Sequence, residues 1–215
     1  AQAYEAAIKY DPNLTDAYRN LAHAYSETRE FGKASAMMAK ALTFEPESDD
    51  ILAELGDIHI AAGDYDRAIN HLAHALDIRP NSTWVYQSLA YAYLQKGMTT
   101  EALEQYKTAT KYEPRNAELY YGMAQVYNKM GMTDDEIAAY KQAILLDPQF
   151  VGARIDLGNA YQVKELYTEA VAEYTNALKY DKNNPFLNYN LGVAYSRMED
   201  HAQAAKHFEA VIKAD

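Results

Sequence analysis

The chain has 215 residues, of which 49% are hydrophobic and 24% are charged, and its formal net charge is -11. This composition is that of a folded protein, and no apolar run approaches the roughly 18 residues that a membrane span needs. The acidic balance argues against nucleic acid as a partner, because phosphates require a basic face. The absence of cysteine excludes disulfides, thiolate metal sites and a cysteine nucleophile.

The start of the chain gives little information on location. It opens within a repeating pattern, at "AQAYEAAIKY", and shows no secretory signal. A chain without cysteine fits a reducing and an oxidising compartment equally well. We expect a cytoplasmic location on this limited ground, and a targeting segment could lie outside this stretch.

Prolines recur at a fixed spacing and organise the chain. Five of them stand 34 residues apart, at Pro12, Pro46, Pro80, Pro114 and Pro148, and Pro185 follows 37 residues later. A strict period of this length is typical of a repeat protein. With the third residue after each proline taken as repeat position 1, we predict one solenoid over 1–215. Its parts are the second helix of a preceding repeat (1–14), full repeats 15–48, 49–82, 83–116, 117–150 and 151–184, and a shortened repeat 185–215.

Small and large residues alternate at fixed repeat positions. Position 8 is always alanine or glycine, position 20 is alanine except at Glu136, and position 24 is large, as in Leu72 and Tyr174. Large residues facing small ones are what two packed helices require. Glycine stands at position 15 in three repeats, and residues such as Asp64 and Thr99 follow it as expected helix caps. Each repeat is therefore predicted to be a helical hairpin.

This pattern resembles the tetratricopeptide repeat over the whole chain, for example in "LGDIHIAAGDYDRAINHLAHALDIRP" and "LGNAYQVKELYTEAVAEYTNALKYD". The resemblance implies an all-α fold, a right-handed superhelical solenoid of stacked antiparallel helix hairpins, with a concave groove lined by the first helix of each repeat. It also implies binding of a protein or peptide, without catalysis. The departures from the family pattern are Arg154 and Asn188 at a bulky position, His59 for tyrosine, Glu136 for alanine and Lys182 for proline.

The 20 tyrosines sort by repeat position. Those at positions 4, 11, 17, 24 and 30 are expected to pack in hairpin cores or turns. Only Tyr91, Tyr121 and Tyr189 remain, and they share positions 2, 5, 9 and 12 with Trp84 and Phe186. At 100° per residue this stripe, which we name the first-helix stripe, faces away from the hairpin core.

The first-helix stripe and its border carry the candidate ligand-binding residues. They are Trp84, Gln87, Tyr91, Tyr121, Gln125, Asn128, Asp57, Glu54 and Asn159. Aromatic side chains give contact area at low entropy cost, and carboxamides can bond the backbone of an extended peptide. We expect Trp84, Tyr91 and Tyr121 to form an anchor pocket across two repeats. The alternative is that these rings only cover neighbouring helices.

Acidic residues are concentrated early in the chain. Residues 1–82 hold 14 acidic and 7 basic residues, net -7, against 17 and 13, net -4, in the remainder. A protein or peptide partner with basic and apolar residues would be attracted to that part. A solvated acidic face, with carboxylates near helix N-termini, is the simpler interpretation.

Signals for metal binding or catalysis are weak. His71 and His74 stand three residues apart on a predicted helix, but the sequence places no third ligand beside them. No nucleophile motif or phosphate loop stands out from the repeat background. We therefore expect no cofactor, no metal and no enzyme activity.

The expected function is that of a protein–protein interaction scaffold. The alternatives are a self-assembling structural scaffold, formed by end-to-end association, and the recognition arm of a larger enzyme such as a transferase. The sequence does not identify the partner.

Overall fold

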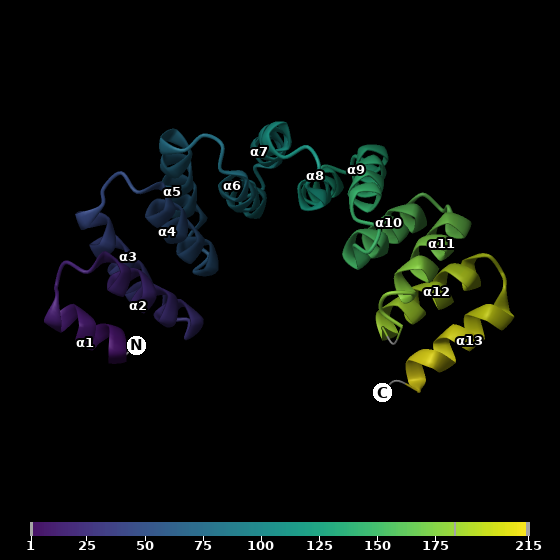
Figure 1. The fold of residues 1–215 in the computed structure, drawn as a ribbon. Coiled ribbons are helices and arrows are strands. Elements are labelled where there is room, and N and C mark those ends of the chain that lie inside the picture. Colours follow the sequence, from purple (N-terminus) through teal and green to yellow (C-terminus); the bar gives the residue numbers. More distant parts are fainter. Residues whose placement is uncertain (1, 183, 214–215) are drawn as a thin grey trace. The chain divides into compact units, whose positions relative to one another are not determined.

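The computed structural model describes residues 2–182 and 184–213, which fold into α-helices joined by short turns (Figure 1). Within these residues no strand occurs, which confirms the all-α prediction. They form two compact units, Ala1–Pro114 and Arg115–Asp215, here named the N-terminal and C-terminal units. Residues 1, 183 and 214–215 of the predicted repeats lie outside the described part. No described helix is long and apolar enough to cross a membrane.

The N-terminal unit consists of a single helix followed by three hairpins. Its helices are α1 (Gln2–Tyr10), α2 (Thr15–Glu27), α3 (Phe31–Phe44), α4 (Asp49–Ala61), α5 (Tyr65–Ile78), α6 (Thr83–Gln95) and α7 (Thr99–Tyr112). The first helices of the hairpins, α2, α4 and α6, each begin at repeat position 1. Besides packing on its own hairpin partner, α4 contacts both α2 and α6.

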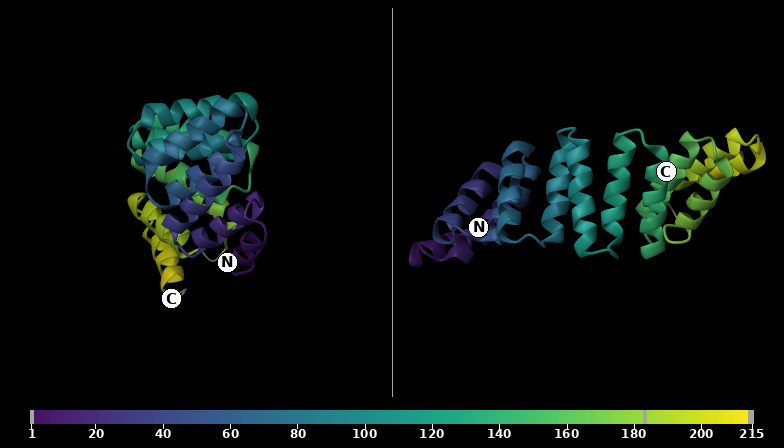
Figure 2. Two further views of the ribbon diagram at one scale, coloured as in Figure 1. Left: turned by 90° about the vertical axis from the view of Figure 1, so that its left-hand side faces the viewer. Right: turned by 90° about the horizontal axis from the view of Figure 1, so that it is seen from above.

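The C-terminal unit repeats this plan with three further hairpins. Its helices are α8 (Ala117–Lys129), α9 (Thr133–Leu146), α10 (Val151–Val163), α11 (Tyr167–Leu178), α12 (Pro185–Arg197) and α13 (His201–Ile212). The two helices of each hairpin lie side by side, as the views in Figure 2 show. The extent of a single solenoid over the whole chain remains a prediction.

The close approach of the two helices in a hairpin occurs where small residues at position 8 meet large ones at position 24. A Cβ atom added to Gly158 would lie 2.4 Å from the Tyr174 ring, and one added to Gly56 would lie 2.6 Å from Leu72. Tyr174 and Leu72 are both fully buried. The predicted fit of large residues against small ones is therefore confirmed at these positions, and it fixes the spacing of the hairpin.

Position 15 makes a left-handed turn between the helices of a hairpin. Gly63, Gly97 and Gly131 have φ values of 77°, 77° and 70°, and Arg29, Glu165 and Glu199 adopt the same region at the equivalent places, with φ near 60°. The left-handed residue makes position 16 the N-cap. Asp64 fills that position and accepts a hydrogen bond from the backbone of Arg67. The prediction that Thr99 caps its helix was wrong, because the turn puts Met98 in the cap position.

Two sets of framework residues differ from expectation. Among the tyrosines at position 30, Tyr10 is 94% exposed and Tyr180 about half exposed, because they lie at or beyond the ends of second helices. Tyr112 is also about half exposed but stacks on Tyr86, with ring centroids 6.1 Å apart, as predicted. Arg154, at a position where a bulky residue was expected, donates to the carbonyl of Pro148 at 2.9 Å. The Tyr86 hydroxyl makes the equivalent bond to the carbonyl of Pro80 at 3.0 Å.

Candidate functional site

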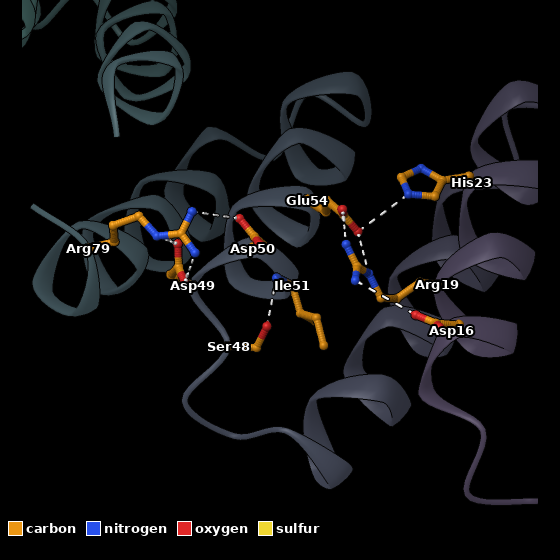
Figure 3. A network of polar contacts seen from close by, with 9 residues as sticks. All are labelled: Asp16, Arg19, His23, Ser48, Asp49, Asp50, Ile51, Glu54 and Arg79. Carbon is orange, nitrogen blue, oxygen red and sulfur yellow. Dashed lines mark hydrogen bonds and ion pairs between the residues drawn. The ribbon is translucent and has the colours of Figure 1, made fainter. Parts of the chain in front are cut away.

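A charged pair links the first two hairpins across their first helices. Arg19 on α2 donates to both carboxylate oxygens of Glu54 on α4, at 3.2 Å from Nε to Oε2 and 2.5 Å from Nη2 to Oε1 (Figure 3). His23 Nε2 lies 3.4 Å from Glu54 Oε2. Arg19 is at position 5, and Glu54 is at position 6 of the next repeat. Glu54, a predicted ligand-binding residue, is thus already paired within the chain.

The same link from position 5 to position 6 of the next repeat occurs in the C-terminal unit, where the donor is an uncharged tyrosine and the acceptor is an aspartate. The Tyr121 hydroxyl on α8 donates to Asp156 Oδ2 on α10 at 2.8 Å. The Tyr121 ring lies 4.8 Å from the ring of Phe150 and 5.7 Å from that of Tyr140, between centroids. Tyr121 is therefore half-buried and packed on its neighbours, as the alternative interpretation of the sequence expected.

The buried surroundings of this link change two pKa values. Burial raises the pKa of Tyr121 to about 12, and the hydrogen bond to Asp156 adds to the rise. Burial also raises the pKa of Asp156, and hydrogen bonds from Tyr121, Asn159 and Tyr140 oppose that rise. Several donors on one carboxylate stabilise its charge, so the cluster is internally satisfied.

Asn159 belongs to a second polar group in the same unit. Its Oδ1 accepts from the Tyr174 hydroxyl at 2.7 Å and from Asn190 Nδ2 on α12 at 3.4 Å. Gln162 Nε2 donates to the Tyr174 hydroxyl at 2.8 Å. Because the Asn159 amide also bonds Asp156, its polar atoms are occupied inside the protein. Asn159 therefore connects α10, α11 and α12.

The remaining predicted residues of α8 are exposed. Asn128 keeps its side chain near the surface while Nδ2 donates to Glu136 Oε1 at 2.9 Å. Glu136 is only 4% exposed, and burial raises its pKa, with the Asn128 bond opposing the rise. Gln125 is exposed and bonds the Tyr121 hydroxyl. Gln125 and Asn128 are thus the predicted residues of α8 that retain polar atoms toward solvent.

On α6 the predicted aromatic residues are open to solvent. Trp84 is 41% exposed and Tyr91 is 44% exposed, in contrast to the packed ring of Tyr121. Gln87 and Ser88 lie between them and are half-buried. Residues at these spacings share one face of a helix. The surface of α6 therefore presents two aromatic rings, separated by polar side chains.

Asp57 stands on α4, which contacts α6, and the Ser88 hydroxyl of α6 favours its charged form. Burial raises the pKa of Asp57, the Ser88 bond opposes the rise, and the charge of Glu54 adds to it. In the described part of the chain, no cation pairs with Asp57. At position 5 of the same repeat stands Ala53, which is fully buried, where Arg19 and Tyr121 supply donors at the other links.

The structure brings some of the predicted residues together and leaves others apart. Glu54 and Asp57 lie one turn apart on α4, and Trp84, Gln87 and Tyr91 share a face of α6. The predicted pocket joining Trp84 and Tyr91 to Tyr121 takes residues from both units and remains a prediction. Sequence reasoning missed the roles of four residues that complete the links: Ser88, Tyr140, Asp156 and Asn190. A recurring separation of 35 residues between donor and acceptor was the available signal.

His59 and His71 pack against each other inside the N-terminal unit. His59 is 7% exposed and stacks on His71, with ring centroids 5.4 Å apart and an interplanar angle of 9°. Burial lowers the pKa of both side chains. Among the described residues no group of three histidine or acidic side chains is arranged to hold a metal ion.

Comparison with known families gives consistent matches along the chain. A TPR repeat description matches residues 91–131 and 164–199. Tetratricopeptide repeat descriptions match residues 30–90 and 59–104, and residues 117–150 and 187–215. No curated protein sequence matches the chain.

Solved structures of similar fold extend over most of the chain. Pseudomonas aeruginosa pilF is 17% identical with a TM-score of 0.76, over 90% of this chain and 88% of that one. MamA from Desulfovibrio magneticus RS-1 is 20% identical with a TM-score of 0.70, over 79% and 96%. YrrB, described as "a TPR protein with an unusual peptide-binding site", is 20% identical with a TM-score of 0.67, over 83% and 92%. At these identities the likeness concerns the fold.

Proposed function

Because the chain belongs to the tetratricopeptide repeat family, we propose that it is an interaction scaffold that holds a segment of a partner protein on its first helices and performs no chemistry of its own. The observation that carries this proposal is the pair of exposed rings on α6. Trp84 and Tyr91 lie two turns apart on one helix face and are each more than 40% exposed. Rings of this size dominate binding energy when a partner buries them.

The polar residues of the same face suit an extended segment. Gln87 stands between the two rings, and its carboxamide offers both a donor and an acceptor to a peptide backbone. A peptide crossing α6 would contact both rings and this carboxamide together. The description of YrrB as a peptide-binding TPR protein supports this type of ligand by analogy of fold.

The charge of the N-terminal unit favours a partner with basic as well as apolar residues. Residues 1–82 carry a net charge of -7, and Asp57 on α4 adjoins the α6 surface. Opposite charge on the partner would speed encounter and orient the segment. In the C-terminal unit, we propose Gln125 and Asn128 as further contacts, because both are exposed. Tyr121 and Asn159 would act there by holding the helices in place.

The test combines capture with titration. Proteins retained by the immobilised chain are identified by mass spectrometry and compared with those retained by the Trp84→Ala/Tyr91→Ala variant. A retained protein that the variant loses is then titrated by calorimetry against both single variants. Each substitution is expected to weaken binding by about 2 kcal/mol or more, the scale of an aromatic hot spot.

A matched control uses a tyrosine outside the proposed surface. Tyr10 on α1 is 94% exposed, and Tyr10→Ala removes a ring of the same kind without touching α6. Its binding should equal that of the parent chain. A captured partner that binds the Trp84 and Tyr91 variants as tightly as the parent contradicts the proposed site.

A further inference from the structure

We propose that the surface formed by Asp57, Trp84, Ser88 and Tyr91, here named the α4–α6 surface, receives an arginine side chain of the partner, with the Asp57 carboxylate as its counter-ion. The inference rests on the proposed function, since it specifies which residue of a bound segment occupies this surface. The occupant is one side chain of a partner protein.

Two carboxylates on α4, those of Glu54 and Asp57, have different surroundings. Glu54 is held by Nε and Nη2 of Arg19 and adjoins His23, so its charge is matched by groups of the same chain (Figure 3). Asp57, one turn later, forms no ion pair in the described part of the chain, and among the groups around it only the Ser88 hydroxyl favours its charged form. Of these two carboxylates, Asp57 is the one whose charge is left for an external cation.

Repeat position 5 supplies a hydrogen-bond donor at two other junctions between repeats. Arg19 and Tyr121 stand at position 5 and reach the acidic residue at position 6 of the following repeat. The repeat that contains Asp57 has Ala53 at position 5, fully buried, and Ser88 stands at position 6 of the next repeat, so the junction of α4 and α6 lacks this bond. No arginine therefore stands at position 5 beside the partly buried carboxylate of Asp57, which is at position 9. A charge in such surroundings gains most from an opposite charge brought by a ligand.

Two aromatic rings stand beside the carboxylate. Ser88, whose hydroxyl favours the charged form of Asp57, follows Trp84 by four residues and precedes Tyr91 by three, so both rings border the serine on the helix surface. A guanidinium group can stack on an aromatic face while its fork pairs with a carboxylate. An ammonium group lacks the planar fork, so the α4–α6 surface fits arginine better than lysine.

The test uses two matched peptide libraries. Both consist of blocked octapeptides with varied flanks, one with arginine at a central position and one with citrulline, which resembles arginine but has no charge. The full chain is bound to each library, and the tightest arginine peptides and their citrulline counterparts are then titrated in solution. The fluorescence of Trp84, the single tryptophan, reports binding at the surface itself.

We expect arginine peptides to bind at least about tenfold more tightly than their citrulline counterparts, as for a charged hydrogen bond. In Asp57→Asn the preference for arginine over citrulline peptides should fall to about twofold or less. The control is Asp66→Asn, which removes the same charge from α5, where Asp66 pairs with Lys96. This control should keep the preference of the parent. Circular dichroism melting verifies that both variants are folded.

Three results would count against the inference. Equal binding of arginine and citrulline peptides by the parent chain overturns it without reference to any variant. An undiminished preference in Asp57→Asn overturns the role of that carboxylate, while peptide binding that still depends on Trp84 and Tyr91 leaves the proposed function standing. If no peptide of either library binds or changes the fluorescence of Trp84, the inference and the peptide-binding function fail together.

Discussion

The first helices of the two units place aromatic and acidic residues in different surroundings. In the C-terminal unit, Asp156 receives hydrogen bonds from Tyr121 and Asn159, and the Tyr121 ring packs on Phe150. In the N-terminal unit, the α6 rings are exposed, and Asp57 has no cation beside it in the described part of the chain.

This comparison separates residue type from residue role. Tyr91 and Tyr121 are both tyrosines on the first-helix stripe, yet one is exposed and the other is bonded and packed. For Tyr121, the following repeat supplies Asp156 as an acceptor and Phe150 as a packing ring. Side chains that the protein itself satisfies stabilise the stack of helices, and those it leaves open are the better candidates for binding.

The largest expected effect compares the two aromatic residues directly. Tyr121→Ala removes a ring packed on Phe150 and Tyr140 together with the bond to Asp156, so we expect a loss of about 2–3 kcal/mol in the free energy of unfolding. Trp84→Ala removes a ring that is 41% exposed and should cost about 1 kcal/mol or less. Urea unfolding followed by far-UV circular dichroism measures both. Equal losses would remove the distinction between the two surfaces.

A second prediction checks that the units share one framework and differ only at the surface. Ala109 in the N-terminal unit and Ala143 in the C-terminal unit are fully buried. Replacing either by leucine should overpack the helix contact and cost about 1–3 kcal/mol. The denaturant midpoints of Ala109→Leu and Ala143→Leu should fall by similar amounts. An unchanged midpoint for both would contradict the assignment of repeat positions.

A third prediction concerns the left-handed turns, which occur in both units. Arg29 and Glu165 adopt positive φ where Gly97 stands in another repeat. Arg29→Gly and Glu165→Gly should each stabilise the protein by about 1 kcal/mol or less, because glycine adopts this conformation without steric cost. Gly97→Ala is the reverse control and should lower stability. Thermal melting of the three variants shows whether each substitution raises or lowers stability.

The smallest expected effect is on how the free energy of unfolding depends on pH, and one residue in each unit contributes to it with opposite sign. The pKa of His59 is lowered by burial, so the unfolded chain binds protons more readily, and this residue costs stability as pH falls below about 6.5. The pKa of Glu136 is raised by burial, so the folded chain binds its proton more tightly, and stability from this residue grows as pH falls.

The measurement compares each variant with the parent at pH 7.5 and pH 5. His59→Tyr, which restores the residue found at this position in other repeats, should gain stability relative to the parent on acidification. Glu136→Gln should lose stability relative to the parent over the same interval. Parallel pH profiles for both variants would mean that these two groups titrate as they do in the unfolded chain.

Much of the fold follows from the sequence because helix packing depends on periodic size. The contact of Gly158 with Tyr174 is predictable from position alone, since small and large residues alternate with the repeat. The exposure of Trp84 and Tyr91 also follows from their place on the helical wheel. These features depend on backbone geometry, which every repeat shares.

The partial burial of the Tyr121 ring and its hydrogen bond to Asp156 could not be predicted from the helical wheel. It is covered by Phe150, which is the N-cap residue of α10 and therefore lies in a turn, where a helical wheel does not apply. At the same place before α4 and α6 stand the small residues Ser48 and Ser82, which offer no such ring to the helices α2 and α4. The hydrogen bond to Asp156 depends on side-chain conformation as well as on position. Such local choices distinguish a covered ring from an exposed one.

The link from position 5 to position 6 of the next repeat has a consequence for how the chain can change length. Removing residues 49–82, one full repeat, would preserve the 34-residue period. First and second helices would still alternate along the chain. Arg19 would then be followed by Ser88 in place of Glu54, and its guanidinium would lose the carboxylate that holds it. Removing 151–184 would likewise bring Tyr121 to Asn190 in place of Asp156. Repeats of equal length are therefore not interchangeable modules, because these two junctions are each matched by a side-chain bond.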